Sequence, residues 1–317
     1  MMNNTWYDIF MEMLYKKYPK KNQLAEALTD LLCIEREAVY RRLRQDVIFP
    51  FTEIVKIATA WNISLDETIG TKVLFRMQPI NYLNPSEEDM AFVHDRVRAL
   101  KQLKTHSNSE YFYVLNNTGR WLSAGFKYLY KFNIFKWAYQ YGNETTNIPY
   151  SQIFIPEKLH KEIDAYYKYV KYVSNTSYIL DNMIFEYMVQ EIKFFHSIFL
   201  ITDKDKELIK QDLYALLDYL LEIANTGCFP ETKNKVHIYI SLLNINTNYS
   251  YFFDGKTEMC RIHSFRMFDS ITYNHDFIEK FKVWIQRNKK ISIKISEADE
   301  KSRIEFFMKQ RQLVDSL

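Results

Sequence analysis

The sequence predicts a mainly α-helical chain, with a small antiparallel sheet inside a larger, helix-rich α+β region. Only 6 Gly and 7 Pro occur among 317 residues, and this scarcity favours long helices over a turn-dense all-β fold. Apolar residues recur at helical spacing over most of the first 225 positions. Later in the chain, VHIYISLLNI, SYFFDGK and EMCRIHSFRMF are typical of strands instead.

Five short helices are expected in the first domain, residues 1–76. The first begins at Thr5 and ends near Lys17, because Pro19 cannot continue it. Ser64 caps the last, LDETI, and Gly70 closes it. The second and third cover about 21–31 and 35–44, and Pro50 and Thr52 introduce the fourth, whose apolar side extends from Ile54 to Trp61.

A second domain is expected over 90–317, after a linker at 77–89. Ser86 would cap its first helix. Apolar residues follow in that helix at 3-4-3 spacing, at Met90, Val93, Val97 and Leu100. This stripe suits either a dimerisation helix or an ordinary packing helix.

The rest of the second domain is expected to be helical first and then mixed. Helices are predicted near 120–140, 157–173, 181–199 and 203–225. The strands come next, with a hairpin turn at Asp254-Gly255. A helix near 275–287, the strand ISIKIS and a last helix from Ala298 to about Val314 complete the chain.

Composition and charge limit the class of protein. Hydrophobic residues make up 47% of the chain, as expected for a folded protein, and the net charge of +3 implies no partner by itself. The N-terminus lacks the pattern of a signal peptide, and no apolar run is long enough to span a bilayer. Three scattered cysteines suggest neither a disulfide framework nor a zinc site. We therefore expect a soluble, cytoplasmic protein that does not contact membranes.

Residues 21–70 resemble the repressor/Cro-type (Xre-like) helix-turn-helix regulators of bacteria. The resemblance lies in NQLAEAL, IEREAVYRRLR, FTEIVKIATAWNIS and, above all, the ending ISLDETIG. In one departure, the stretch from Ala25 to Ile34 is about one helical turn longer than is usual in this family. Either the second helix is extended, or Thr29 takes the small-residue position. In another, Cys33 stands in the turn where glycine is common.

The resemblance makes 35–44 the recognition helix and double-stranded DNA the partner. Val39 and Leu43 would face inward, because they lie four residues apart. The outer face would then carry Arg36, Glu37, Tyr40, Arg41 and Arg44.

Each residue of this outer face has an expected role in binding DNA. In this class the N-terminal part of the recognition helix meets base edges in the major groove. Arg36 is therefore expected to bind guanine with two hydrogen bonds, and Glu37 to accept from cytosine. Tyr40 and Arg41 lie one turn further along and could contact bases or phosphates. Arg44, near the helix end, is expected to contact phosphate.

Lys20 and Lys21 extend the expected interface to the start of the second helix, where such proteins contact the DNA backbone. The first domain is nevertheless not strongly basic, because residues 1–76 hold 11 Lys and Arg against 10 Asp and Glu. So few cations would bind DNA weakly, which favours a homodimer on a two-fold symmetric operator.

The sequence thus predicts a sequence-specific DNA-binding transcriptional regulator with a C-terminal regulatory domain and a possible small-molecule effector. A solvated helix face is the ordinary alternative for exposed arginines, and Glu37–Arg41 is a typical i,i+4 pair. On that interpretation, the helical domain would be a protein–protein interaction module that does not bind DNA.

Known catalytic motifs are absent from the sequence: it contains no GxGxxG, GxxxxGK[ST], HExxH or GxSxG. The seven histidines are dispersed, and the pair Cys260 and His263 lacks a second pair of metal ligands. Neither enzymatic activity, a metal nor a cofactor is expected.

Aromatic residues are dense in the second domain, notably in YFYVLNN, WLSAGFKYLYKFNIFKWAYQYG and AYYKYVKYV. They could fill a large helical core, line a pocket for a small organic ligand, or form a partner surface. The sequence leaves these three interpretations open.

Overall fold

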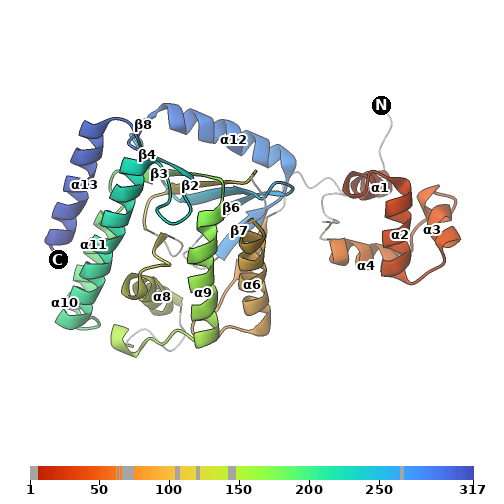
Figure 1. The fold of residues 1–317 in the computed structure, drawn as a ribbon. Helices are drawn as coiled ribbons and strands as arrows, with labels where there is room; N and C mark the ends of the chain where they lie inside the picture. Colours follow the sequence, from red (N-terminus) through yellow and green to blue (C-terminus); the bar gives the residue numbers. More distant parts are fainter. Residues whose placement is uncertain are drawn as a thin grey trace. The chain divides into compact units, whose positions relative to one another are not determined.

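The computed structural model describes residues 6–61, 63, 65, 75–103, 108–118, 122–141, 148–264 and 268–317. The chain divides into two compact units, Met1–Leu74 and Phe75–Leu317 (Figure 1). Each unit has its own hydrophobic core.

Helices build the described part of the first unit. They are α1 (Trp6–Lys17), α2 (Lys21–Leu32), α3 (Arg36–Leu43) and α4 (Phe51–Trp61). The bounds of α2 and α3 lie within one residue of the expected ones, and α4 begins between Pro50 and Thr52, which were expected to introduce it. Thr5, Ser64, Gly70 and the expected fifth helix lie outside the described residues.

The core of the first unit draws on all four helices. Its centre consists of completely buried apolar side chains, among them Phe10, Leu14, Leu24, Leu28, Val39 and Ile57. Burial of one such side chain stabilises the fold by about 1.5–3 kcal/mol. The Tyr7 hydroxyl also accepts a hydrogen bond from the Phe49 backbone N–H at 3.0 Å, which ties the start of α1 to the segment before α4.

The second unit contradicts the expected small antiparallel sheet. Its described residues form one eight-stranded mixed sheet in the order β1-β7-β6-β5-β2-β3-β4-β8. The strands are β1 (Arg76–Pro79), β2 (Glu110–Leu115), β3 (Asn175–Asp181), β4 (Lys235–Ser241), β5 (Asn248–Phe253), β6 (Glu258–Ser264), β7 (Phe268–Thr272) and β8 (Ser292–Lys294). Strands β2, β3 and β4 run parallel, whereas every other pairing is antiparallel. The expected hairpin turn at Asp254-Gly255 between β5 and β6 is confirmed.

Strands β2 and β3 were missed because both of their faces are buried. Tyr111 and Tyr113 face the larger core, while Phe112 and Val114 face a second core on the opposite side of the sheet. Such a strand is a short continuous apolar run rather than an alternating one, and its sequence cannot be distinguished from a buried helix segment.

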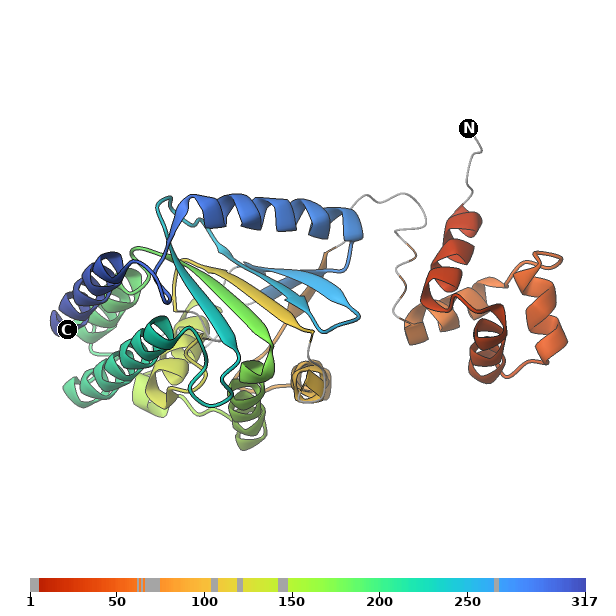
Figure 2. The ribbon, with the colours of Figure 1, turned by 45° about the horizontal axis from the view of Figure 1, so that its top comes forward.

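Helices cover both faces of this sheet (Figures 1 and 2). They are α6 (Glu87–Gln102), α8 (Lys127–Tyr141), α9 (Glu157–Tyr169), α10 (Glu186–Ser197), α11 (Asp203–Thr226), α12 (His275–Lys290) and α13 (Glu300–Asp315). Helix α12 lies on one face and packs through Ile278, Phe281 and Ile285. The other six contribute to the larger core on the opposite face. None of the helices in the described ranges is both long and apolar enough to cross a membrane.

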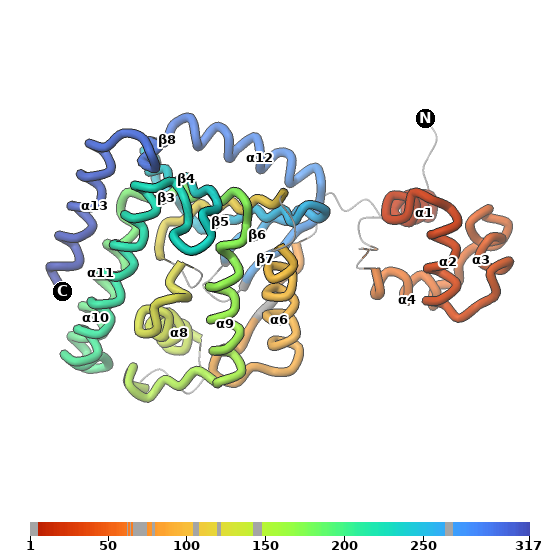
Figure 3. Tube along the Cα trace, in the orientation of Figure 1, coloured from red at the N-terminus to blue at the C-terminus, as the bar shows by residue number. Residues whose placement is uncertain are grey.

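The parallel strands β2, β3 and β4 are connected by helices on the face of the sheet that carries the larger core. The trace in Figure 3 runs from β2 through α8 and α9 to β3, and from β3 through α10 and α11 to β4. The carboxyl ends of β2, β3 and β4 therefore lie along one edge of the sheet.

Residues 77–89 are not the expected linker but part of the second unit. Arg76–Pro79 pair with β7 as an edge strand, and α6 begins at Glu87. Ser86 caps α6 as expected, in a capping box with Asp89. Met90, Val93, Val97 and Leu100 pack into the unit's own core, which favours the packing helix over the dimerisation helix.

Candidate nucleic-acid interface

Helix α3 is fixed in the first unit by its inner face. Val39 is completely buried and Leu43 almost so, as the four-residue spacing predicts. Helix α2 supplies the surface on which they pack, with Leu24, Ala25 and Leu28 completely buried. The opposite face of α3 is consequently held towards solvent.

Helix α2 continues without a break to the turn before α3. Helix α2 spans Lys21–Leu32, with Ala25 completely buried and Thr29 only half-buried, which favours Ala25 as the small residue. Cys33 ends the helix in the left-handed conformation, with φ of 55°. Glycine usually takes this backbone position, because other residues are strained there.

The predicted recognition residues share the outer face of α3. Arg36, Glu37, Arg41 and Arg44 are exposed, and Tyr40 is half-buried. The Tyr40 hydroxyl donates a hydrogen bond to Asn22 Oδ1 at 3.0 Å. The Arg36 guanidinium lies 5.8 Å from the centre of the Tyr40 ring, within the range of a cation–π contact. Tyr40 therefore joins α3 to the start of α2.

Lys20 and Lys21 lie next to Asn22 in the chain, and both are exposed. Because Asn22 bonds to Tyr40, the first turn of α2 lies beside the exposed face of α3. The two lysines therefore begin the helix whose first turn contacts α3 through Asn22.

The Arg42 side chain makes contacts within the first unit and does not lie on the outer face of α3. Its guanidinium makes two hydrogen bonds to the Glu53 carboxylate, at 2.6 and 2.8 Å, and a third to the Ala38 carbonyl at 3.1 Å. The Arg42 and Glu53 side chains are only 15% and 16% exposed. This ion pair attaches α3 to α4, so the charge of Arg42 has a structural partner.

Arg44 is also paired, but at the surface. It contacts Glu37 at 3.0 Å and Asp46 at 2.9 Å. Hydrogen bonds to these two carboxylates raise its pKa above the ordinary value of arginine. Solvent-exposed pairs of this kind are weak, so phosphate could replace the carboxylates.

Four cations remain for a ligand: Lys20, Lys21, Arg36 and Arg41. Within the described part of the chain, none of them pairs with a carboxylate. The sequence identified this set and left Arg42 out of the outer face, but it did not reveal that Arg42 pairs with Glu53, 11 residues away. It also gave no sign of Asn22 as the residue that positions Tyr40.

The first unit exposes apolar side chains as well. Ile48 is 61% and Phe51 73% exposed, in the segment that leads from α3 into α4. The hydrophobic pattern of α4 did not predict this, because Phe51 lies at the first position of the helix.

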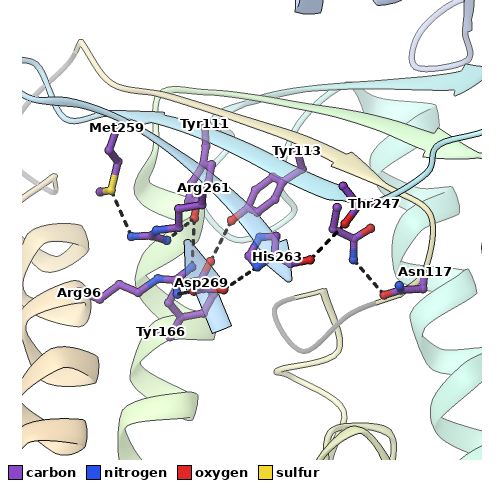
Figure 4. A network of polar contacts seen from close by, with 11 residues as sticks. Arg96, Tyr111, Tyr113, Asn117, Tyr166, Thr247, Met259, Arg261, His263 and Asp269 are labelled. Carbon is purple, nitrogen blue, oxygen red and sulfur yellow. Dashed lines mark hydrogen bonds and ion pairs between the residues drawn. The ribbon is translucent and has the colours of Figure 1, made fainter. Parts of the chain in front are cut away.

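A buried polar network lies between α6 and the sheet of the second unit (Figure 4). Arg96 contacts the Asp269 carboxylate at 3.2 Å, and the other oxygen of that carboxylate lies 2.6 Å from Nδ1 of His263. Arg96 and Arg261 both donate to the Tyr111 hydroxyl, at 3.3 and 3.1 Å.

The two guanidinium groups determine the acidity of Tyr111. Burial by itself would raise its pKa, but the charges of Arg261 and Arg96 outweigh burial and lower the pKa to about 8. The Tyr111 ring also stacks on Tyr113, with centroids 4.0 Å apart. The network comes from four separate chain segments, which is why no sequence motif reveals it.

Two groups of potential metal ligands do not form a metal site. Cys260 packs into the core under α12, whereas His263 pairs with Asp269 in the polar network. Glu258, His275 and Glu279 do approach one another. However, the Lys282 ammonium binds both carboxylates of that group, and so it occupies the place of a cation.

The aromatic segments noted in the sequence mostly fill the larger core. Phe132, Phe135 and Tyr166 are almost completely buried. Phe132 stacks on Phe135, which makes a T-shaped contact with the buried ring of Tyr150. This favours the core over the other two interpretations for these segments.

Comparisons with protein-family models, with curated proteins and with solved structures find no match to this chain.

Proposed function

We propose that the first unit binds double-stranded DNA through α3 and that the chain is a transcriptional regulator of the helix-turn-helix type. The observation that carries the proposal is the exposed face of α3: in the described ranges, carboxylates pair with Arg42 and Arg44 but not with Arg36 or Arg41. A helix of this kind fits the major groove, and a guanidinium there can bind guanine O6 and N7 together. Lys20 and Lys21 would contact phosphates beside the groove.

The remaining residues of this face take secondary roles in the proposal. Tyr40 supports the Arg36 side chain through its ring. Glu37 and Arg44 exchange their mutual ion pair for a cytosine and a phosphate. Such a small set of cations supports binding as a homodimer on a symmetric operator in the cytoplasm, where three free cysteines would stay reduced.

The test is selection of duplexes from a random pool, followed by affinity measurements at two salt concentrations. Arg36→Ala should weaken binding by about 1–3 kcal/mol and relax the preference at one base pair. Arg41→Ala should weaken binding and reduce its salt dependence. Arg98→Ala is the matched control, because it removes one exposed arginine from the second unit. The proposal fails if no sequence is enriched, or if all three variants bind like the wild type.

Exposed apolar residues favour a second candidate, in which the first unit binds another protein. Ile48 and Phe51 would then be its contact residues. Phe51→Ser should abolish such an interaction and leave the DNA affinity unchanged. A partner interaction that is insensitive to salt, together with no DNA selection, would favour this candidate over DNA binding.

A further inference from the structure

A pocket opens on the second unit where α12 meets the connection between β4 and β5. Its volume is about 540 Å³. That lies within the range of about 300–1,000 Å³ that small-molecule sites occupy. The pocket adjoins Ser241, the last residue of β4, and so it lies at the carboxyl ends of the parallel strands. In α/β sheets, ligands bind preferentially at this edge.

The wall formed by the β4–β5 connection is held in place by hydrogen bonds. The Asp181 carboxylate, at the end of β3, accepts from the backbone N–H groups of Ile245 and Met183, at 2.9 and 2.8 Å. The Ser241 hydroxyl bonds to both backbone groups of Leu243. A ligand would therefore find this wall already formed, without the cost of ordering a loop.

Aromatic rings form the opposite wall. Trp284 and Phe281 of α12 are nearly parallel, with an angle of 20° and centroids 5.5 Å apart. Tyr249 of β5 meets the Trp284 ring at 5.4 Å. Phe281 is buried, but 38% of Trp284 is exposed and open to the pocket. A flat ring stacks well on such a surface.

The polar groups that line the pocket indicate the charge of a ligand that would fit it. Lys280 is the one charged residue among the described residues that line it, and no carboxylate in the described ranges pairs with its ammonium group. The other polar side chains are neutral, chiefly the amides of Asn244, Asn246 and Asn288. An anionic group would gain an ion pair with Lys280 and meet no repulsion from the lining.

We propose that this pocket binds a planar aromatic compound that carries one negatively charged group. The ring system stacks on Trp284, and the anionic group lies at Lys280. The site belongs to the second unit alone, and its proposed ligand binding does not depend on whether the first unit binds DNA.

The test uses the full chain, without DNA, and two fluorescent probes of nearly the same shape. One is 8-anilinonaphthalene-1-sulfonate, an aromatic anion, and the other is N-phenyl-1-naphthylamine, which lacks the sulfonate. The wild type should bind the sulfonate about fivefold more tightly than the amine. Trp284→Ala should weaken the binding of both probes about tenfold.

Lys280→Gln separates recognition of the charge from stacking. It should remove the preference for the sulfonate and leave the affinity for the amine unchanged. Lys290→Gln is the matched control, because Lys290 is an exposed lysine of the same helix outside the pocket lining, and it should keep the preference. Equal affinities of the wild type for the two probes, or full binding by Trp284→Ala, would overturn the proposal. Since Lys280 is exposed, its substitution leaves the fold intact even if Trp284→Ala does not fold.

Discussion

Arginines lie on the surface of α3 in the first unit, whereas in the second unit Arg96 and Arg261 are buried between α6 and the sheet. On the surface, water screens the charge, and Arg36 and Arg41 can exchange solvent for a ligand. In the interior, a guanidinium needs fixed partners, and Asp269 and Tyr111 provide them. The comparison teaches that surroundings, and not the density of arginines in the sequence, determine whether an arginine is free to bind.

The largest loss of stability is expected at Asp269, whose carboxylate contacts both Arg96 and His263 in the buried network. Asp269→Asn removes the negative charge that contacts the buried Arg96 guanidinium, so we expect it to lower the free energy of unfolding by about 3–5 kcal/mol. Chemical denaturation of the second unit would measure this loss. Asp95→Asn is the control, because Asp95 pairs with Arg98 at the surface, and it should change stability by less than about 0.5 kcal/mol. Similar losses in both variants would contradict the distinction between buried and exposed arginines.

In both units, the sequence predicted well the structure that depends on neighbouring residues, and poorly the contacts between residues that are far apart in the chain. The helices of the first unit and the inward direction of Val39 and Leu43 follow from periodicity, which operates within a few residues. The Arg42–Glu53 pair and the network around Tyr111 depend on contacts across 11 to 173 positions. A single sequence does not indicate such contacts.

The sheet and the pocket were missed for related reasons. Strands β2 and β3 carry apolar residues on both faces, so the alternation that marks a strand is absent. The aromatic segments that suggested a pocket fill the core. The pocket proposed here uses Tyr249, Phe281 and Trp284 from two elements that the sequence did not show to be neighbours.

Tyr111 allows a second test of the buried network, by pH. Its pKa of about 8 is lower in the folded chain than the ordinary value of 10.0 in the unfolded chain. An acidic group whose pKa is lower in the folded chain stabilises the fold fully above its pKa in the unfolded chain. This stabilisation is lost as the pH falls through its pKa in the folded chain. The free energy of unfolding should therefore rise from pH 8 to pH 10, by on the order of 2 kcal/mol.

Tyr111→Phe should remove that rise, because phenylalanine has no proton to lose. The difference in unfolding free energy between the variant and the wild type, measured across this pH range, isolates Tyr111 from the other titrating groups. The difference in absorbance at 295 nm between the wild type and Tyr111→Phe would follow the ionisation of Tyr111 among the 24 tyrosines. A difference that stays constant from pH 8 to pH 10 would show that the two arginines do not stabilise the phenolate.

The smallest expected changes in stability distinguish Arg42, in α3, from Arg44, which follows the last residue of that helix. Arg42→Ala removes a half-buried pair with two hydrogen bonds to Glu53, and we expect it to destabilise the first unit by about 1–2 kcal/mol. Glu53→Gln and the double variant complete a double-mutant cycle, which should give a coupling energy of similar size.

Arg44→Ala should leave thermal stability unchanged at moderate salt, because its pairs with Glu37 and Asp46 are exposed. Its effect should appear instead as weaker DNA binding with the same sequence preference. Equal destabilisation by both variants would mean that the surface pairs of α3 also hold the fold together, and that fewer of its arginines are free to bind DNA.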